Sequence, residues 1–178
     1  MILQGKVWKV GDNISSDHFI SPKYDSMGRK GRYAELALHI LEDADPKFIE
    51  KVQRGDLIVA GKSFGSGKHL GSLIGAFKEL GIGGVIAESF SAAWERASIN
   101  AGLPALADKS IQPMVETGDV LRIDLDSNEA CNVTQGCTVK LSPVSTVIYQ
   151  ILQAGGLEPF TLLRLARQGE SQSKRDTQ

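Results

Sequence analysis

Two short, uninterrupted apolar runs constrain the fold of this chain more than any other feature. Residues 57–60 (LIVA) and 84–87 (GVIA) have the length and continuous apolar character of strands that are buried on both faces. Each run precedes a segment with apolar residues at helical spacing, over 70–81 and 89–102, and each segment ends on a glycine. Two successive strand–helix units require parallel strands joined by crossover helices, so we expect an α/β fold.

The remaining segments are assigned by the same periodicity and turn signals. They predict strands over 4–10 and 120–125, a hairpin over 131–141, and helices over 33–42, 46–52, 145–156 and 157–169. The chain has 178 residues and contains no linker long enough to separate two domains. We therefore expect one domain over 1–168, followed by a polar, disordered tail over 169–178.

Charge and cysteine content exclude several classes of function. Lys and Arg number 20 against 21 for Asp and Glu, so the chain lacks the basic field that attracts nucleic acid or anionic membranes. No apolar run reaches the roughly 18 residues of a membrane span. The first ten residues lack the apolar core of a signal peptide, which predicts a cytoplasmic protein. Cys131 and Cys137 are too few for a disulfide framework or a four-cysteine metal site.

A glycine-rich segment, residues 61–69 (GKSFGSGKH), lies between the first buried strand and its helix. It fails the phosphate-loop pattern, because Lys62 stands where the first glycine belongs and His69 where the magnesium-binding hydroxyl belongs. The backbone N–H groups of such a turn can still bind an anion at a helix N-terminus, with Lys68 and His69 at the rim. The alternative is a tight turn with a solvated Lys68.

Four segments together resemble the small subunit of 3-isopropylmalate dehydratase, which is similar to the swivelling fourth domain of aconitases. They are residues 11–17 (GDNISSD), 61–67 (GKSFGSG), 85–90 (VIAESF) and 96–104 (RASINAGLP), in the order that the family has them. The resemblance implies a swivelling β/β/α domain, as in the aconitase C-terminal domain. It also implies a separate large subunit that carries a [4Fe-4S] cluster on three cysteines, and a small carboxylic acid substrate.

The resemblance breaks down directly after Gly67. Family members continue with Ser-Ser-Arg-Glu, in which the second serine is the base and the arginine binds a substrate carboxylate. This chain has Lys68, His69, Leu70 and Gly71 there. We expect His69 to replace the serine as base, kept neutral by Lys68 and by the positive end of the helix. The alternative is a His69 that is turned inward as a buried helix cap.

A second loop carries further candidate groups for substrate binding. Aconitases have an Asp-His-Ile-Ser run followed by a carboxylate-binding arginine, and this chain has a similar run at 17–21 (DHFIS). The loop over 24–32 then supplies Arg29, Lys30 and Arg32, and we expect it to be a mobile flap. A solvated basic loop without a role is the alternative. The predicted substrate-binding residues are Asp17, His18, Arg29, Arg32, Ser66, Gly67 and Lys68.

These observations predict the small subunit of a heteromeric hydro-lyase that dehydrates or isomerises a small hydroxy acid. His69 would take the proton, and the large subunit would carry the iron–sulfur cluster, so this chain alone would hold no metal and catalyse no dehydration. The alternative is a swivel domain that has lost catalysis and binds an anion or regulates a partner. The absence of the family's serine and arginine favours the alternative, whereas the retained glycines and two basic groups favour the enzyme.

Overall fold

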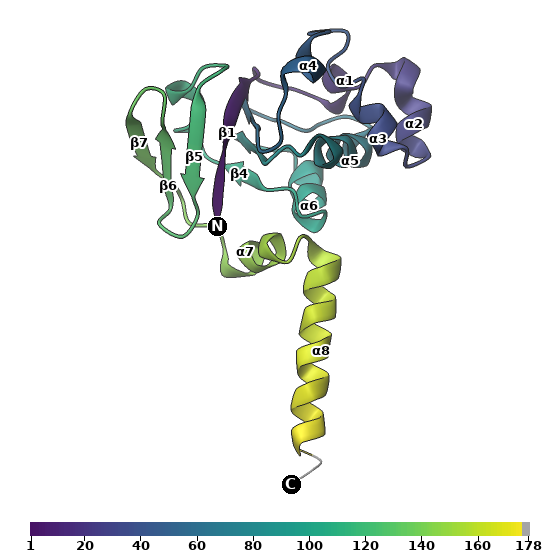
Figure 1. The fold of residues 1–178 in the computed structure, drawn as a ribbon, viewed down its shortest axis with the longest axis vertical. Helices are drawn as coiled ribbons and strands as arrows, with labels where there is room; N and C mark the ends of the chain where they lie inside the picture. Colours follow the sequence, from purple (N-terminus) through teal and green to yellow (C-terminus); the bar gives the residue numbers. More distant parts are fainter. Residues whose placement is uncertain (176–178) are drawn as a thin grey trace.

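A seven-stranded sheet of order β4-β3-β2-β1-β5-β6-β7 forms the centre of the molecule (Figure 1). The computed structural model describes the backbone of residues 1–175 and the side chains of residues 1–168. The strands are β1 (Ile2–Lys9), β2 (Leu57–Ala60), β3 (Gly84–Ala87), β4 (Ala105–Ala107), β5 (Val120–Asp124), β6 (Glu129–Asn132) and β7 (Cys137–Lys140). β1 to β4 run parallel, whereas β5 pairs antiparallel with the other edge of β1 and continues into the antiparallel β6 and β7.

Helices cover the parallel half of the sheet and extend beyond it. They are α1 (Ser16–Phe19), η1 (Pro22–Tyr24), α2 (Asp25–Arg29), α3 (Tyr33–Ala37), α4 (Phe48–Lys51), α5 (Leu70–Leu80), α6 (Ala92–Asn100), η2 (Gln112–Met114), α7 (Thr146–Gln153) and α8 (Leu157–Arg175). The two predicted crossover helices are confirmed as α5 and α6. α6 begins at Ala92, three residues later than predicted, because the Ser91 side chain caps it by accepting a hydrogen bond from the Trp94 N–H.

Two hydrophobic cores lie on opposite faces of the parallel strands. Ile58 and Ala60 face a core shared with the helices around α5, whereas Leu57 and Val59 face a core shared with the antiparallel strands. Successive side chains of a strand point to opposite faces, so burial on both faces accounts for the continuous apolar run of β2. The helical core is centred on aromatic rings, including the buried Trp94.

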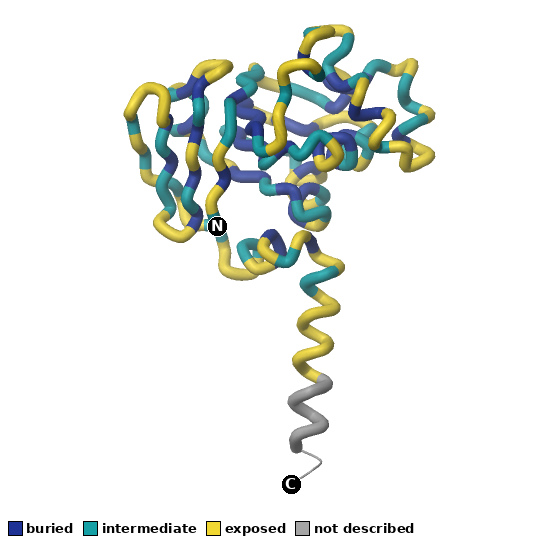
Figure 2. The backbone as a smooth tube through the Cα atoms, viewed as in Figure 1, coloured by how far each residue is buried: buried dark blue, intermediate teal, exposed yellow. Residues whose placement is uncertain are grey.

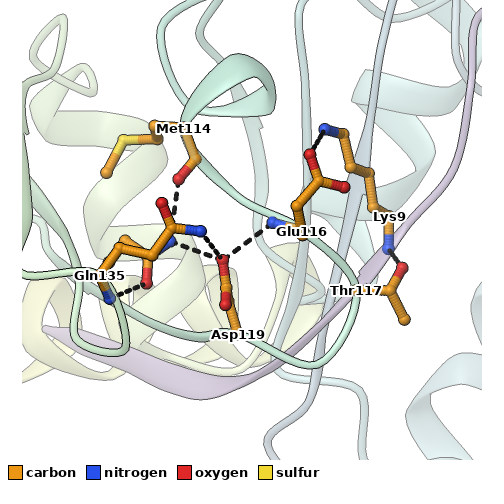
Figure 3. A network of polar contacts seen from close by, with 7 residues as sticks. Lys9, Met114, Glu116, Thr117, Asp119 and Gln135 are labelled. Atoms are coloured by element: carbon orange, nitrogen blue, oxygen red, sulfur yellow. Dashed lines mark hydrogen bonds and ion pairs between the residues drawn. The ribbon is translucent and has the colours of Figure 1, made fainter.

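A polar network joins the antiparallel strands to the parallel half of the sheet (Figure 3). The buried Asp119 accepts hydrogen bonds from the Glu116 N–H at 2.9 Å, the Asn132 side chain at 2.8 Å and the Gln135 side chain at 2.7 Å. These hydrogen bonds hold the pKa of Asp119 below its usual value, and the bond from the Glu116 N–H has the largest effect. Nζ of Lys9 in β1 donates to Glu116 at 2.9 Å, so the network ties β1 and the turn before β5 to the β6–β7 hairpin.

Several predicted boundaries lie one to three residues from those of the structure, and larger differences occur at α3, β4 and α8. The helix predicted over 33–42 ends as an α-helix at Ala37, and Leu41 has a positive φ of 58° while its N–H bonds the carbonyl of Phe19. β4 was not predicted, because three residues are too short for a periodic signal. Helix α8 continues through Arg175, where a tail was predicted from residue 169, and residues 176–178 lie outside the described part of the chain.

Helix α8 leads away from the rest of the molecule (Figure 1), and its residues 161–168 are exposed (Figure 2). Leu162, Leu163 and Leu165 are 61%, 53% and 58% exposed. Within residues 1–175, no helix has the length and apolar character needed to cross a membrane.

Candidate functional site

The glycine-rich loop packs against the segment before α1, so two of the four motifs lie side by side. The loop follows β2 and precedes α5, as predicted. The Gly65 N–H donates to the carbonyl of Ile14 at 2.8 Å, and the Ser16 N–H donates to the carbonyl of Ser66 at 2.8 Å. Residues 11–17 and 61–67 are thus joined by backbone hydrogen bonds that do not depend on side-chain identity.

The N-terminus of α6, which follows the third motif, closes the other side of the loop. Gly65 has a φ of +84°, and a Cβ placed there would lie 2.4 Å from the Cβ of the buried Trp94. The Ser91 hydroxyl donates to the carbonyl of Gly65 at 2.5 Å. Only glycine combines this left-handed backbone with so close an approach, so the loop conformation depends on residue 65.

His69 is the N-cap residue of α5 and lies between two carboxylates. Its Nδ1 atom is 2.9 Å from Oδ1 of Asp25, and its Nε2 atom is 4.0 Å from Oδ1 of Asp17. Its backbone N–H donates to the Ser16 hydroxyl at 3.1 Å, and that hydroxyl lies 3.3 Å from Oδ1 of Asp17. The structure therefore brings His69 together with Asp17 of the first loop and with Asp25 at the start of α2.

The charge around the His69 ring differs from the prediction. Lys68 was expected to keep the imidazole neutral, but Lys68 is exposed and the charged groups that contact the ring are carboxylates. The alternative of a buried capping side chain also fails, because the ring makes no capping hydrogen bond and its side chain is 22% exposed. His69 is a partly accessible imidazole beside two acidic groups.

The segment predicted to be a mobile flap is folded into η1 and α2, which counts against a flap. Gly28 is buried, and Met27 packs against the helical core. The Arg29 guanidinium lies 2.9 Å from Oδ2 of Asp25. Arg32 makes a forked contact with Glu35, which raises the pKa of Arg32 and lowers the pKa of Glu35. Both arginines thus have internal carboxylate partners.

The other predicted substrate-binding residues lie at the exposed rim of the same loop pair. Ser66, Gly67 and Lys68 are exposed, as are Asp17 and His18. The Nδ1 atom of His18 accepts a hydrogen bond from the Ser15 N–H at 3.0 Å, so this ring caps α1. Its neutral form then carries the ring proton on Nε2.

A cluster around Glu42 holds the chain just before α2. Glu42 accepts hydrogen bonds from the Tyr24 hydroxyl at 2.6 Å and from Lys23 Nζ at 3.1 Å, and it lies 2.6 Å from Nδ1 of His39. The hydrogen bond from Tyr24 is the largest of several causes that lower the pKa of Glu42 to about 2. The Tyr24 and His39 rings stack with centroids 3.9 Å apart.

We expect the stabilisation from Glu42 to disappear in acid. A carboxyl whose pKa falls on folding stabilises the folded state above its unfolded pKa, and this contribution is lost as the pH falls through the folded pKa. The difference in unfolding free energy between wild type and Glu42→Gln should therefore shrink between the usual value of 4.5 and about 2. Urea unfolding at several pH values measures it. The control is Glu79→Gln, which removes an exposed carboxylate on α5. The same dependence of unfolding free energy on pH in both variants would contradict the prediction.

The two cysteines do not fit an iron–sulfur cluster. Cys131 pairs with Thr138 and Cys137 pairs with Asn132 in the β6–β7 ladder, so the two thiols point to opposite faces of the sheet. Among the described residues, no group of three or more His, Cys, Asp or Glu side chains is arranged to hold a metal ion. The described side chains, those of residues 1–168, therefore offer no ligand set for such a cluster.

Comparison with known proteins gives a consistent set of relatives, although no protein-family model matches the chain. It is 40% identical over 161 residues to a 3-isopropylmalate dehydratase small subunit of Archaeoglobus fulgidus, covering 90% of this chain and 94% of that protein. It is 38% identical over 156 residues to one of Thermotoga maritima, covering 88% and 92%. It is also 38% identical over 165 residues to the isopropylmalate/citramalate isomerase small subunit of Methanocaldococcus jannaschii, covering 93% and 96%.

A solved structure has the same fold. The crystal structure of 3-isopropylmalate dehydratase from Methanocaldococcus jannaschii matches with a TM-score of 0.85 and 34% identity, over 96% of this chain and 99% of that chain. The predicted fold class, an α/β swivelling domain of the aconitase type, is confirmed by this match.

Proposed function

The chain belongs to the family of 3-isopropylmalate dehydratase small subunits, and on that premise we propose that it is the small subunit of a hydro-lyase acting on a small hydroxy acid. 3-Isopropylmalate is the first substrate to test. The observation that carries the proposal is the position of His69, at the N-terminus of α5 beside Asp17 and the end of the glycine-rich loop. An imidazole there has the chemistry of a general base.

We propose that Nε2 of His69 removes a proton from the carbon next to the one that carries the hydroxyl group. The C–H bond breaks and its electron pair forms the C=C bond, while the C–O bond on the neighbouring carbon breaks. The hydroxyl group leaves and takes up a proton as water, and His69 later returns its own proton to solvent. The partly exposed ring, with Nε2 directed toward Asp17 at 4.0 Å, supports this role.

We propose that Arg29, rather than Arg32, binds a substrate carboxylate. The fork of Arg32 is occupied by Glu35, whereas the Arg29 side chain is 71% exposed and contacts Asp25 through one terminal nitrogen. Its remaining donors suit a carboxylate. Asp25 in turn contacts His69, so a substrate held by Arg29 lies close to the base. Backbone N–H groups of Ser66 and Gly67, with Lys68, Asp17 and His18, would complete the polar rim.

The partner in this proposal is a large subunit that carries the iron–sulfur cluster. The relatives are named as small subunits, which supports a two-subunit enzyme. The two cysteines of this chain face away from each other across the sheet, so the cluster ligands would come from the partner. The cluster is outside this chain, and the chain's own residues supply the base and the carboxylate contacts.

The experiment is reconstitution. The chain is purified with and without its large subunit, iron and sulfide are measured, and formation of the unsaturated acid is followed with 3-isopropylmalate and related hydroxy acids. We expect turnover only when both subunits are present and iron only when the large subunit is present. Stoichiometric iron and sulfide in this chain alone would contradict the proposal. Turnover by the large subunit without this chain, or by this chain without the large subunit, would also contradict it.

A catalytically altered swivel domain is the second candidate, and the packing of Leu70 favours it. Leu70 contacts the helical core at the position where the family carries its carboxylate-binding arginine, so it leaves no charge there. A stable complex with the large subunit that dehydrates none of the hydroxy acids would support this second function over the first.

A further inference from the structure

Asp25 approaches His69 with a carboxylate oxygen that is shielded from solvent. Oδ1 of Asp25 is buried and accepts no hydrogen bond of good geometry within the described residues, while Nδ1 of His69 lies 2.9 Å away. The side chain of Asp25 is 20% exposed, and its other oxygen, Oδ2, contacts Arg29 at 2.9 Å. A buried carboxylate oxygen needs a donor, and the His69 ring is the donor within reach.

The contact is set by the packing of α2 against α5. A Cβ on Gly28 would lie 2.3 Å from the hydroxyl oxygen of Ser72, so the two helices touch at this pair of residues. Asp25 lies three residues before Gly28, and His69 lies three residues before Ser72, so each is one turn upstream of the contact point. The helix contact therefore places the carboxylate and the imidazole together.

We infer that Asp25 is a positioning residue that fixes the tautomer and orientation of His69. Its carboxylate accepts a hydrogen bond from the Nδ1–H group, so the proton stays on Nδ1 and the lone pair on Nε2 faces Asp17 and solvent. A neutral histidine carries one ring proton, and the hydrogen bond made by one nitrogen decides which nitrogen is free. The inference rests on the proposed role of His69 as base, but the pairing itself can be tested without any assay of turnover.

The first test is nitrogen NMR of the isolated, full-length chain with ¹⁵N-labelled histidine, recorded where the imidazole is neutral. The chain has only 3 histidines, and the signals of His69 are identified by their loss in His69→Gln. We expect the proton on Nδ1 in the wild type, and a shift to Nε2 in Asp25→Asn and Asp25→Ala. Asp43→Asn, which changes an exposed carboxylate, is the matched control and should leave the tautomer unchanged. A wild-type proton on Nε2, or a proton that stays on Nδ1 in both variants, would overturn the inference.

The second test is turnover of the assembled two-subunit enzyme. Asp25→Asn keeps the shape of the side chain. It is expected to lower kcat by roughly 10²–10⁴, because a base in the wrong tautomer loses the contribution of general-base catalysis. KM should change by only a few-fold. An unchanged kcat in Asp25→Asn, with a large loss of kcat in His69→Ala, would refute the positioning role of Asp25 and leave His69 as the base. Unchanged turnover in His69→Ala, with the Nδ1 tautomer still observed, would instead refute the proposed base and leave the pairing as a structural contact.

Discussion

Replacement of His69 by alanine is expected to lower the turnover of the assembled enzyme by roughly 10²–10⁴, the usual contribution of a general base. The variant should still fold, because the ring makes no capping hydrogen bond and the bond from the residue 69 N–H to the Ser16 hydroxyl is unaffected by the side chain. Steady-state kinetics with saturating large subunit and substrate measure the loss, and urea unfolding of the single chain checks the fold.

The control for this variant is His39→Gln. His39 contacts Tyr24 and Glu42, and a glutamine amide can still donate to Glu42, so turnover should stay within about twofold of wild type. Unchanged turnover in His69→Ala, with a folded chain and a bound partner, would remove His69 as the base. The proton would then be taken by a group of the large subunit.

Gly65→Ala is expected to destabilise the isolated chain by about 3 kcal/mol, because two costs coincide at this residue. A left-handed backbone costs an alanine roughly 1–2 kcal/mol, and a methyl group forced into a well-packed core costs roughly 1–3 kcal/mol. The new Cβ would lie 2.4 Å from the Cβ of Trp94, which is buried and cannot move aside freely. The midpoint of urea unfolding should fall accordingly.

Gly71→Ala is the matched control for Gly65→Ala. A Cβ at Gly71 would meet nothing within 4 Å, and residue 71 lies in the first turn of α5. Alanine there should leave stability unchanged or raise it by up to about 1 kcal/mol, because alanine has the higher helix propensity. Equal unfolding midpoints for the two variants would contradict the packing of the loop against Trp94.

The parallel strands could be predicted from sequence because their signal is local. β2 and β3 are buried on both faces, so every residue in them is apolar or glycine, and the following helices carry regular apolar spacing. The early end of α3 was not predictable in this way. It depends on the hydrogen bond between the N–H of Leu41 and the carbonyl of Phe19, a tertiary contact that no periodicity reveals.

The candidate site was predictable only in part, because some of its contacts are local in sequence and others depend on tertiary packing. Asp17 ends one motif and His69 lies two residues after another, and their meeting follows from backbone hydrogen bonds between the two loops. Asp25 was missed because its contact with His69 depends on how closely α2 packs against α5. The ion pairs of Arg29 and Arg32 did have a signal, since their partners lie four residues before and three residues after them. That spacing favours a folded segment over a flap.

Chemical rescue tests most directly whether His69 is the base of a two-subunit hydro-lyase. His69→Gly, assembled with its large subunit, is assayed with free imidazole and with substituted imidazoles of different basicity. We expect added imidazole to restore part of the lost turnover, and the rescued rate to rise with the basicity of the added base. Full turnover of His69→Gly without imidazole, or a folded and assembled variant that no imidazole rescues, would contradict this expectation.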